Sequence, residues 1–183
     1  KLNTNENPYS PSGNVSKAIS ATCEGRSLAK YPDPFANQFR NQAADVLGVG
    51  RDMILCGNGS DDLLTILVRC YAGVGDAIRV PTPSYILYQT LADIQGVLCD
   101  KVAFTEEWLL PESFTSPDAP TGEPVRLAIV PNPNSPSGTL LPPEQLLALA
   151  EELPCPLVVD EAYGDFSESN CLDLVERSDR IIV

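Results

Sequence analysis

Residues 127–160 read LAIVPNPNSPSGTLLPPEQLLALAEELPCPLVVD, and this stretch decides the fold. It opens with a short apolar run, Leu127–Val130, and closes with another, Leu157–Val159, as buried strands do. Between them a helix starts at Pro142–Glu144, because proline is tolerated in the first helical turn, and Pro154 ends it. Buried apolar strands that alternate with amphipathic helices predict an α/β fold with a mainly parallel sheet covered on both faces.

The same alternation continues over residues 35–183, whereas residues 1–34 are polar and rich in turns. We therefore expect an N-terminal arm or small subdomain over 1–34, with a weak helix at Val15–Thr22, and a larger domain over 35–183. In that larger domain, further strands are expected at Met53–Cys56, Ala77–Val80, Val97–Val102 and Ile181–Val183, and further helices at 35–47, 60–71, 85–94 and 171–177. The proline-rich residues 105–124 predict an irregular surface connection.

The composition excludes several classes of function. The 183 residues carry 12 Lys and Arg against 25 Asp and Glu, a formal charge of −13, which argues against nucleic-acid and anionic-membrane partners. There is no His, so Ser–His and Cys–His nucleophile pairs and His-containing metal sites are impossible within the chain. The six cysteines form no C-x-x-C pair and are expected to be reduced and mostly buried. With no signal-peptide pattern and no long apolar run, we expect a cytoplasmic protein.

Unusual residues gather where the predicted strands end. In open parallel sheets, ligands bind beyond the carboxyl ends of the strands. Four stretches occupy such places: Gly57–Asp61, Thr82–Tyr85, Asn132–Gly138 and Asp160–Tyr163.

Asp160 ends a buried strand, where a carboxylate is costly unless a cation pairs with it. No Lys or Arg follows until Arg177, so a ligand cation is an attractive partner, and a protonated pyridine ring would serve. Tyr163 is then placed to donate to a hydroxyl oxygen on the same ring. The alternatives are a solvated acid beside a packing tyrosine, or a metal site built from Asp160, Glu161 and Asp165.

Gly57–Asp61 leads into a predicted helix start, which suits a phosphate group. It is half of a G-x-G-x-x-G pattern, because Asp62 occupies the place of the third glycine. The alternative is a plain glycine turn with Ser60 as the helix N-cap. For a phosphate site, the side chains of Asp61 and Asp62 must point away from the ligand. Tyr85 could then lie flat against an aromatic ring.

In their order along the chain, these residues resemble the fold-type I pyridoxal-phosphate aminotransferases, and are most similar to the histidinol-phosphate aminotransferases. The matching motifs are Leu2–Tyr9 (LNTNENPY), Tyr31–Asp33 (YPD), Gly57–Asp61 (GNGSD), Pro83–Tyr85 (PSY), Pro133–Gly138 (PNSPSG) and Asp160–Tyr163 (DEAY).

The resemblance implies roles for individual residues. The amides of Ser60 and Asp61 would hold the cofactor phosphate, and Tyr85 would stack on the ring. Asp160 would pair with the pyridine nitrogen, and Tyr163 would hydrogen-bond the ring hydroxyl. The remaining implied roles are Tyr31 reaching the cofactor of the other subunit in a homodimer, and Tyr9 lining the substrate pocket.

Two departures from the family pattern matter. The usual turn is N-N-P-T-G, and its second Asn, which contacts the ring hydroxyl, is replaced by Ser135, so either Ser135 or Asn134 makes that contact. The Schiff-base lysine follows the strand that corresponds to Ile181–Val183, and the lysines present lie elsewhere, at positions 1, 17, 30 and 101. We therefore expect a partial cofactor-binding domain without the C-terminal small domain and without activity alone.

The expected reaction of the intact enzyme is pyridoxal-phosphate-dependent amino transfer from histidinol phosphate to 2-oxoglutarate, in histidine biosynthesis. Its partners would be a small-molecule amino donor and a 2-oxo acid. A related fold-type I enzyme, such as a threonine-phosphate decarboxylase or an aromatic aminotransferase, is one alternative. The others are a lysine-less, non-catalytic binding protein and a nucleotide-binding α/β module, and the latter leaves Asp160 and Tyr163 without a role.

Overall fold

The structure, a computed structural model, describes residues 6–24 and 27–183. The chain divides into two compact units, and the break falls between Phe39 and Arg40. The sequence places its boundary a few residues earlier, between residues 34 and 35. Helix α2 (Asn37–Leu47) spans this region and ends at Gly48, whose φ of +74° is the left-handed conformation expected of a glycine after a helix.

The N-terminal unit contains helix α1 (Gly13–Cys23) and a short 3₁₀ turn, η1 (Ser27–Ala29). The helix begins where the Ser12 hydroxyl accepts a hydrogen bond from the backbone amide of Val15. Its side chains are exposed, in agreement with the weak apolar periodicity of this segment. The first unit therefore owes little to a core of its own.

The second unit is built on a parallel sheet, which the described residues show with five strands in the order β2-β1-β3-β4-β5. Every pair of neighbouring strands is parallel, as the buried apolar runs predict. The strands are β1 (Ala77–Thr82), β2 (Leu98–Ala103), β3 (Val125–Pro131), β4 (Leu157–Asp160) and β5 (Ile181–Ile182).

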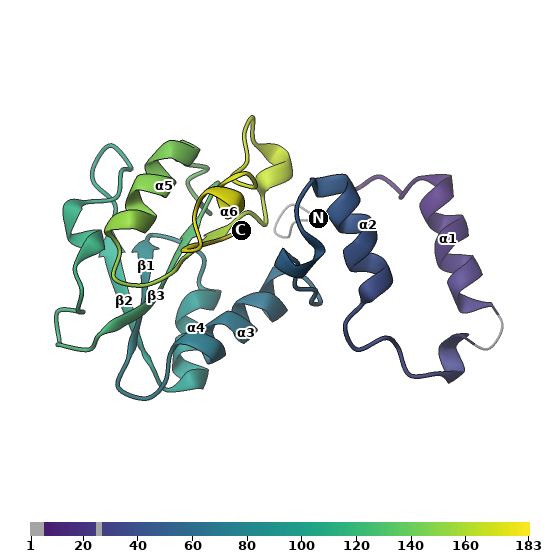
Figure 1. Ribbon diagram of the computed structural model, residues 1–183. Coiled ribbons are helices and arrows are strands. Elements are labelled where there is room, and N and C mark those ends of the chain that lie inside the picture. Colours follow the sequence, from purple (N-terminus) through teal and green to yellow (C-terminus); the bar gives the residue numbers. More distant parts are fainter. Residues whose placement is uncertain (1–5, 25–26) are drawn as a thin grey trace. The chain divides into compact units, whose positions relative to one another are not determined.

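Helices cover both faces of this sheet. Along β3, Leu127 and Ile129 belong to one buried cluster, whereas Ala128 and Val130 belong to another, because successive side chains of a strand point to opposite faces. The first cluster packs against α3 (Ser60–Tyr71) and α4 (Leu87–Gln95), and the second against α5 (Pro143–Glu152) and α6 (Leu174–Arg177). Figure 1 shows α5 on one side of the strands and α3 and α4 on the other.

The strand order reverses between β1 and β3. Strand β2 pairs with one edge of β1, and the chain then returns to place β3 on the other edge. Such a switch point separates the loops that leave the two strands and makes room for a ligand at their carboxyl ends. The residues that follow β1 and β3 therefore lie where the fold favours binding.

One predicted strand is absent. Residues 51–53 form a 3₁₀ turn, η2 (Arg51–Met53), and residues 54–56 form no strand. Ile54 has extended backbone angles, but Leu55 is 59% exposed, and among the described residues no strand pairs with this segment. An extended backbone at Ile54 is not enough, because a strand also requires a hydrogen-bonded neighbour.

The connection over residues 105–124 was predicted to lie on the surface, but part of it is buried. It contains η3 (Glu112–Thr115), whose Phe114 side chain is fully buried. The Arg79 guanidinium, from the middle of β1, donates hydrogen bonds to the backbone carbonyls of Phe114 and Asp118. This buried cation draws the connection onto the sheet, which the prolines alone did not indicate.

Two smaller predictions need correction. Gly59, with φ of +84°, is the N-cap of α3, so Ser60 is the first helical residue instead of the cap. Among the cysteines, which all carry free thiols, only Cys155 and Cys171 are buried. The others are exposed or half-buried: Cys23, Cys56, Cys70 and Cys99.

Candidate active site

The predicted site residues of the second unit converge at the carboxyl ends of the strands. The pKa of Tyr85 is raised, first by burial and then by the nearby charges of Asp61, Tyr163 and Asp160. The glycine-loop residue Asp61 and the β4 residue Asp160, about a hundred positions apart, are thus both within electrostatic reach of one tyrosine.

A single cavity connects the start of α3 with the end of β4. Its volume is about 410 Å³, within the usual range for small-molecule sites. Gly59 and Ser60, at the start of α3, and Asp160, Glu161 and Ala162, at the end of β4, are among the residues that line it. The phosphate-type and cation-type features predicted from the sequence are therefore close enough for one small molecule to bridge.

The start of α3 suits an anion. Gly59 caps the helix without a side-chain hydrogen bond, which leaves the positive end of the helix dipole uncovered at this point. The Asp62 carboxylate turns back and accepts a hydrogen bond of 3.0 Å from the backbone amide of Asn58. Asp62 is thus held by the loop that precedes the helix, whereas Asp61 lies within electrostatic reach of Tyr85.

Asp160 has partners that the sequence did not reveal. Its Oδ2 accepts a 2.7 Å hydrogen bond from the hydroxyl of Tyr88, and its Oδ1 accepts one of 3.0 Å from the backbone amide of Ala162. Tyr88 is 1% exposed and lies in the first turn of α4, one turn beyond Tyr85. The two tyrosine rings meet edge to face, 5.8 Å between centroids. The Y-x-x-Y spacing was the only signal that could have pointed to Tyr88.

The loop after β3 is held by Asn134, which is 3% exposed. The side-chain amide donates hydrogen bonds to the Pro83 carbonyl at 3.2 Å and to the Ser137 hydroxyl at 2.8 Å. Its oxygen accepts one of 3.0 Å from the hydroxyl of Ser84. The adjacent Ser135 is half-buried. Asn134 is thus committed to joining the loops that follow β1 and β3.

The Glu161 side chain binds the backbone at Cys171. Its Oε1 accepts a 2.6 Å hydrogen bond from the backbone amide of Cys171, and burial raises its pKa. Within residues 6–24 and 27–183, no three His, Cys, Asp or Glu side chains form a group that could hold a metal ion. The alternative of a metal site from Asp160, Glu161 and Asp165 is therefore wrong for this arrangement.

Tyr163, Tyr9 and Tyr31 differ in their settings. Tyr163 follows β4, interacts electrostatically with Tyr85, and its ring lies 6.4 Å from that of Phe166. Tyr9 and Tyr31 belong to the N-terminal unit, and both are exposed in this chain. Their assignments to substrate and to a second subunit stay predictions.

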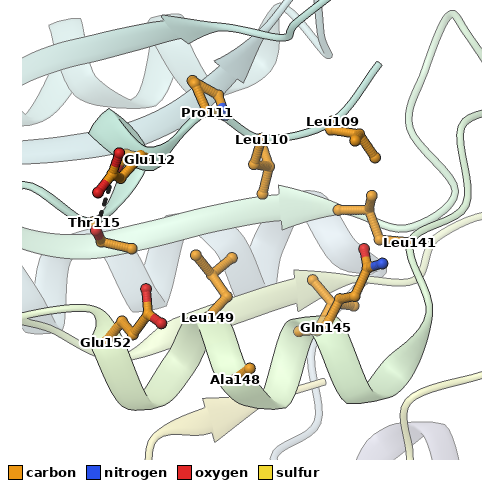
Figure 2. Close-up of a pocket in the computed structure, with 11 residues that line it drawn as sticks. Leu109, Leu110, Pro111, Glu112, Thr115, Leu141, Gln145, Ala148, Leu149 and Glu152 are labelled. Atoms are coloured by element: carbon orange, nitrogen blue, oxygen red, sulfur yellow. Dashed lines mark hydrogen bonds between the residues drawn. The ribbon is translucent and has the colours of Figure 1, made fainter. Parts of the chain in front are cut away.

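A second hollow, of about 310 Å³, lies between α5 and the segment over residues 109–115 (Figure 2). Leu109, Leu110 and Leu149 supply apolar walls, and the Thr115 hydroxyl donates to the backbone carbonyl of Glu112. None of the predicted site residues lines it. This hollow lies on the face of the sheet that α5 covers, and it is separate from the cavity at Asp160.

No helix in the described parts of the chain has the length and apolarity needed to cross a bilayer. The family described as aminotransferase class I and II matches residues 1–183. Histidinol-phosphate aminotransferase from Rhodopirellula baltica is 52% identical over the whole chain, which covers 49% of that protein. The protein of the same name from Syntrophotalea carbinolica is 42% identical, again over the whole chain and 51% of its own length.

Solved structures of aminotransferases have the same fold as this chain. Histidinol-phosphate aminotransferase from Sinorhizobium meliloti, in complex with pyridoxal-5'-phosphate, superimposes with a TM-score of 0.72 at 26% identity, covering 86% of this chain and 42% of that one. A structure from Erwinia carotovora shares the fold with a TM-score of 0.82 at 22% identity, covering 98% of this chain and 54% of that one. The chain spans about half the length of the curated relatives it matches. Since the family matches residues 1–183 from end to end, and the start of α3 and the end of β4 line one cavity, the chain belongs to the class I and II aminotransferases.

Proposed function

We propose that the protein carrying this chain is a pyridoxal-phosphate-dependent aminotransferase that moves the amino group of histidinol phosphate to 2-oxoglutarate, in histidine biosynthesis. The observation that carries the proposal is the cavity shared by the start of α3 and the end of β4. The names of the most similar relatives support the choice of substrate.

The donor set of the cavity fits this cofactor. A phosphate group matches the amides of Ser60 and Asp61, because a helix start presents unpaired N–H groups and a partial positive charge. A protonated ring nitrogen matches the Asp160 carboxylate, which lines the same cavity. Tyr85 is half exposed beside them and can present its ring to an aromatic face.

Each of the chain's residues at the site would have its own role toward the cofactor ring. Asp160 holds a proton on the ring nitrogen, and Tyr163 donates to the ring hydroxyl. Because the Asn134 amide is already used by Pro83 and Ser137, Ser135 is the better candidate for the second contact with that hydroxyl. When bound, pyridoxal phosphate supplies an electron sink for the bond changes at the substrate carbon.

Other parts of the proposal lie with the complete protein. The covalent lysine is expected after β5, since the lysines at positions 1, 17, 30 and 101 do not match the family's position. Tyr31 would reach the cofactor phosphate of a second subunit in a cytoplasmic homodimer, and Tyr9 would line the substrate pocket. The 183 residues alone are expected not to transaminate.

The experiment is cofactor uptake followed by turnover. The complete protein, prepared without cofactor, should bind pyridoxal phosphate and gain a visible absorption band that disappears when the expected lysine is replaced. It should then form glutamate from 2-oxoglutarate and histidinol phosphate. Failure to bind the cofactor contradicts the proposal, and release of carbon dioxide from threonine phosphate favours the decarboxylase alternative. Normal turnover by residues 1–183 alone would contradict the assignment of the lysine.

A further inference from the structure

Tyr88 joins two elements that are far apart in the sequence. It lies in α4, and its hydroxyl donates a 2.7 Å hydrogen bond to Oδ2 of Asp160, 72 positions later at the end of β4. Its ring belongs to the buried cluster between α3, α4 and the sheet. A phenylalanine would fill the same apolar space, so the hydroxyl has a purpose other than packing.

The hydroxyl is a permanent donor. Burial, followed by the charge of Asp160 and the hydrogen bond to it, raises the pKa of Tyr88 far above its ordinary value. The phenol therefore keeps its proton at neutral pH. A hydrogen bond from such a donor to a carboxylate is shorter and stronger than one between neutral groups.

The two hydrogen bonds at Asp160 orient its carboxylate. Ala162 donates to Oδ1 from the chain just beyond β4, and Tyr88 donates to Oδ2 from α4. Each oxygen retains a second lone pair that can accept from a ligand. With both oxygens held, Asp160 needs no reorientation when a ligand cation arrives in the cavity.

We infer that Tyr88 is a positioning residue of the cofactor site, which holds the Asp160 carboxylate ready to pair with a protonated ring nitrogen. The inference rests on the proposed function, since it concerns how that site recognises the cofactor ring. The competing view is that Tyr88 only stabilises the packing of α4 on the sheet.

A double-mutant cycle separates these views. The complete protein is titrated with pyridoxamine phosphate, which binds without a covalent bond, and the dissociation constant is measured by calorimetry. We expect Tyr88→Phe to weaken binding about tenfold when Asp160 is present, as loss of a hydrogen bond to a charged group predicts. In an Asp160→Ala background, Tyr88→Phe should change the dissociation constant less than about twofold, because there is no carboxylate left to position.

Controls address folding and the generic effect of losing a phenol. Tyr71→Phe, at the partly exposed end of α3, should leave the dissociation constant unchanged. If Tyr88→Phe does not fold, 3-fluorotyrosine at position 88 keeps the shape and alters the acidity of the donor. When Asp160 is present, the dissociation constant of the 3-fluorotyrosine protein should differ from that of the tyrosine protein. In the Asp160→Ala background, the two dissociation constants should be equal.

The outcomes are distinct. Equal effects of the Tyr88 change in both backgrounds, or no loss of affinity with Asp160 present, overturn the positioning role and leave the proposed function intact. A parent protein that binds no pyridoxamine phosphate overturns the proposed function and this inference with it. If Tyr88→Phe lowers the affinity only when Asp160 is present, the result supports the positioning role and the proposed function.

Discussion

The hydroxyl of Ser84 donates a 3.0 Å hydrogen bond to the side-chain oxygen of Asn134, so the loop after β1 is tied to the loop after β3. These are the two strands between which the sheet reverses its order. The Asn134 amide adds a second tie, to the carbonyl of Pro83. The carboxyl ends of these two strands are therefore joined by a buried amide whose two N–H donors are both used.

Replacing Asn134 should therefore affect folding. Asn134→Ala removes the acceptor of Ser84 and the donor to Pro83 and Ser137, so the two loops lose three hydrogen bonds at once. We expect the free energy of unfolding to fall by about 1–3 kcal/mol, measured by urea denaturation. Ser135→Ala is the matched comparison: it should alter stability by less than about 0.5 kcal/mol while weakening cofactor binding. If Asn134→Ala weakens cofactor binding and Ser135→Ala does not, the cofactor contact belongs to Asn134.

Replacing Asp160 should affect turnover more than folding. Asp160→Asn keeps an oxygen that can accept from the Tyr88 hydroxyl but removes the charge that would hold the ring-nitrogen proton. Amino transfer by the complete protein should slow about 100-fold or more, as for the loss of one preorganised electrostatic contact. Thermal denaturation should show a change in unfolding free energy of less than about 1 kcal/mol. Retention of full activity would contradict the pyridinium role of Asp160.

The buried pair Arg79 and Asp100 should dominate the stability of the sheet's outer edge. The guanidinium lies 2.7 Å from Oδ2 of Asp100, with both side chains nearly inaccessible. Arg79→Met leaves that carboxylate unpaired and releases the carbonyls of the 105–124 connection, at a cost of about 3–5 kcal/mol in unfolding free energy.

An exposed ion pair supplies the control for Arg79. Arg126 contacts Asp76 at 3.1 Å, and its side chain is about half exposed. Arg126→Met should cost less than about 1 kcal/mol. Similar losses for Arg79→Met and Arg126→Met would show that the buried pair is not a special determinant of stability.

The buried thiols should be unreactive in the folded protein. Burial raises the pKa of Cys155 to about 11 and that of Cys171 to about 12, so the thiolate that reacts with alkylating agents is scarce at pH 8. Peptide mapping after iodoacetamide treatment at pH 8 should find both residues unmodified. The same treatment in denaturant, where they are accessible, should label both. Rapid labelling of Cys171 without denaturant would contradict its burial against Asn132.

Much of the site could be anticipated because its signals are local. Gly57–Asp61, Thr82–Tyr85, Asn132–Gly138 and Asp160–Tyr163 each combine unusual residues with a predicted strand or helix boundary. The structure brings Asp61, Asp160 and Tyr163 within electrostatic reach of Tyr85. Tyr88 was missed because a tyrosine on the apolar face of a helix has the same local pattern whether or not its hydroxyl finds a partner.

The amino-acid sequence was sufficient to determine the alternation of buried strands and amphipathic helices, since both periodicities depend on neighbouring residues alone. Only the tertiary structure decided which residues meet across the sheet. The bond from Tyr88 to Asp160, the use of Asn134 as a tie and the absence of a strand at Met53–Cys56 all depend on partners distant in the chain. Hydrogen bonds join groups by position in space, and strand register and helix packing set those positions.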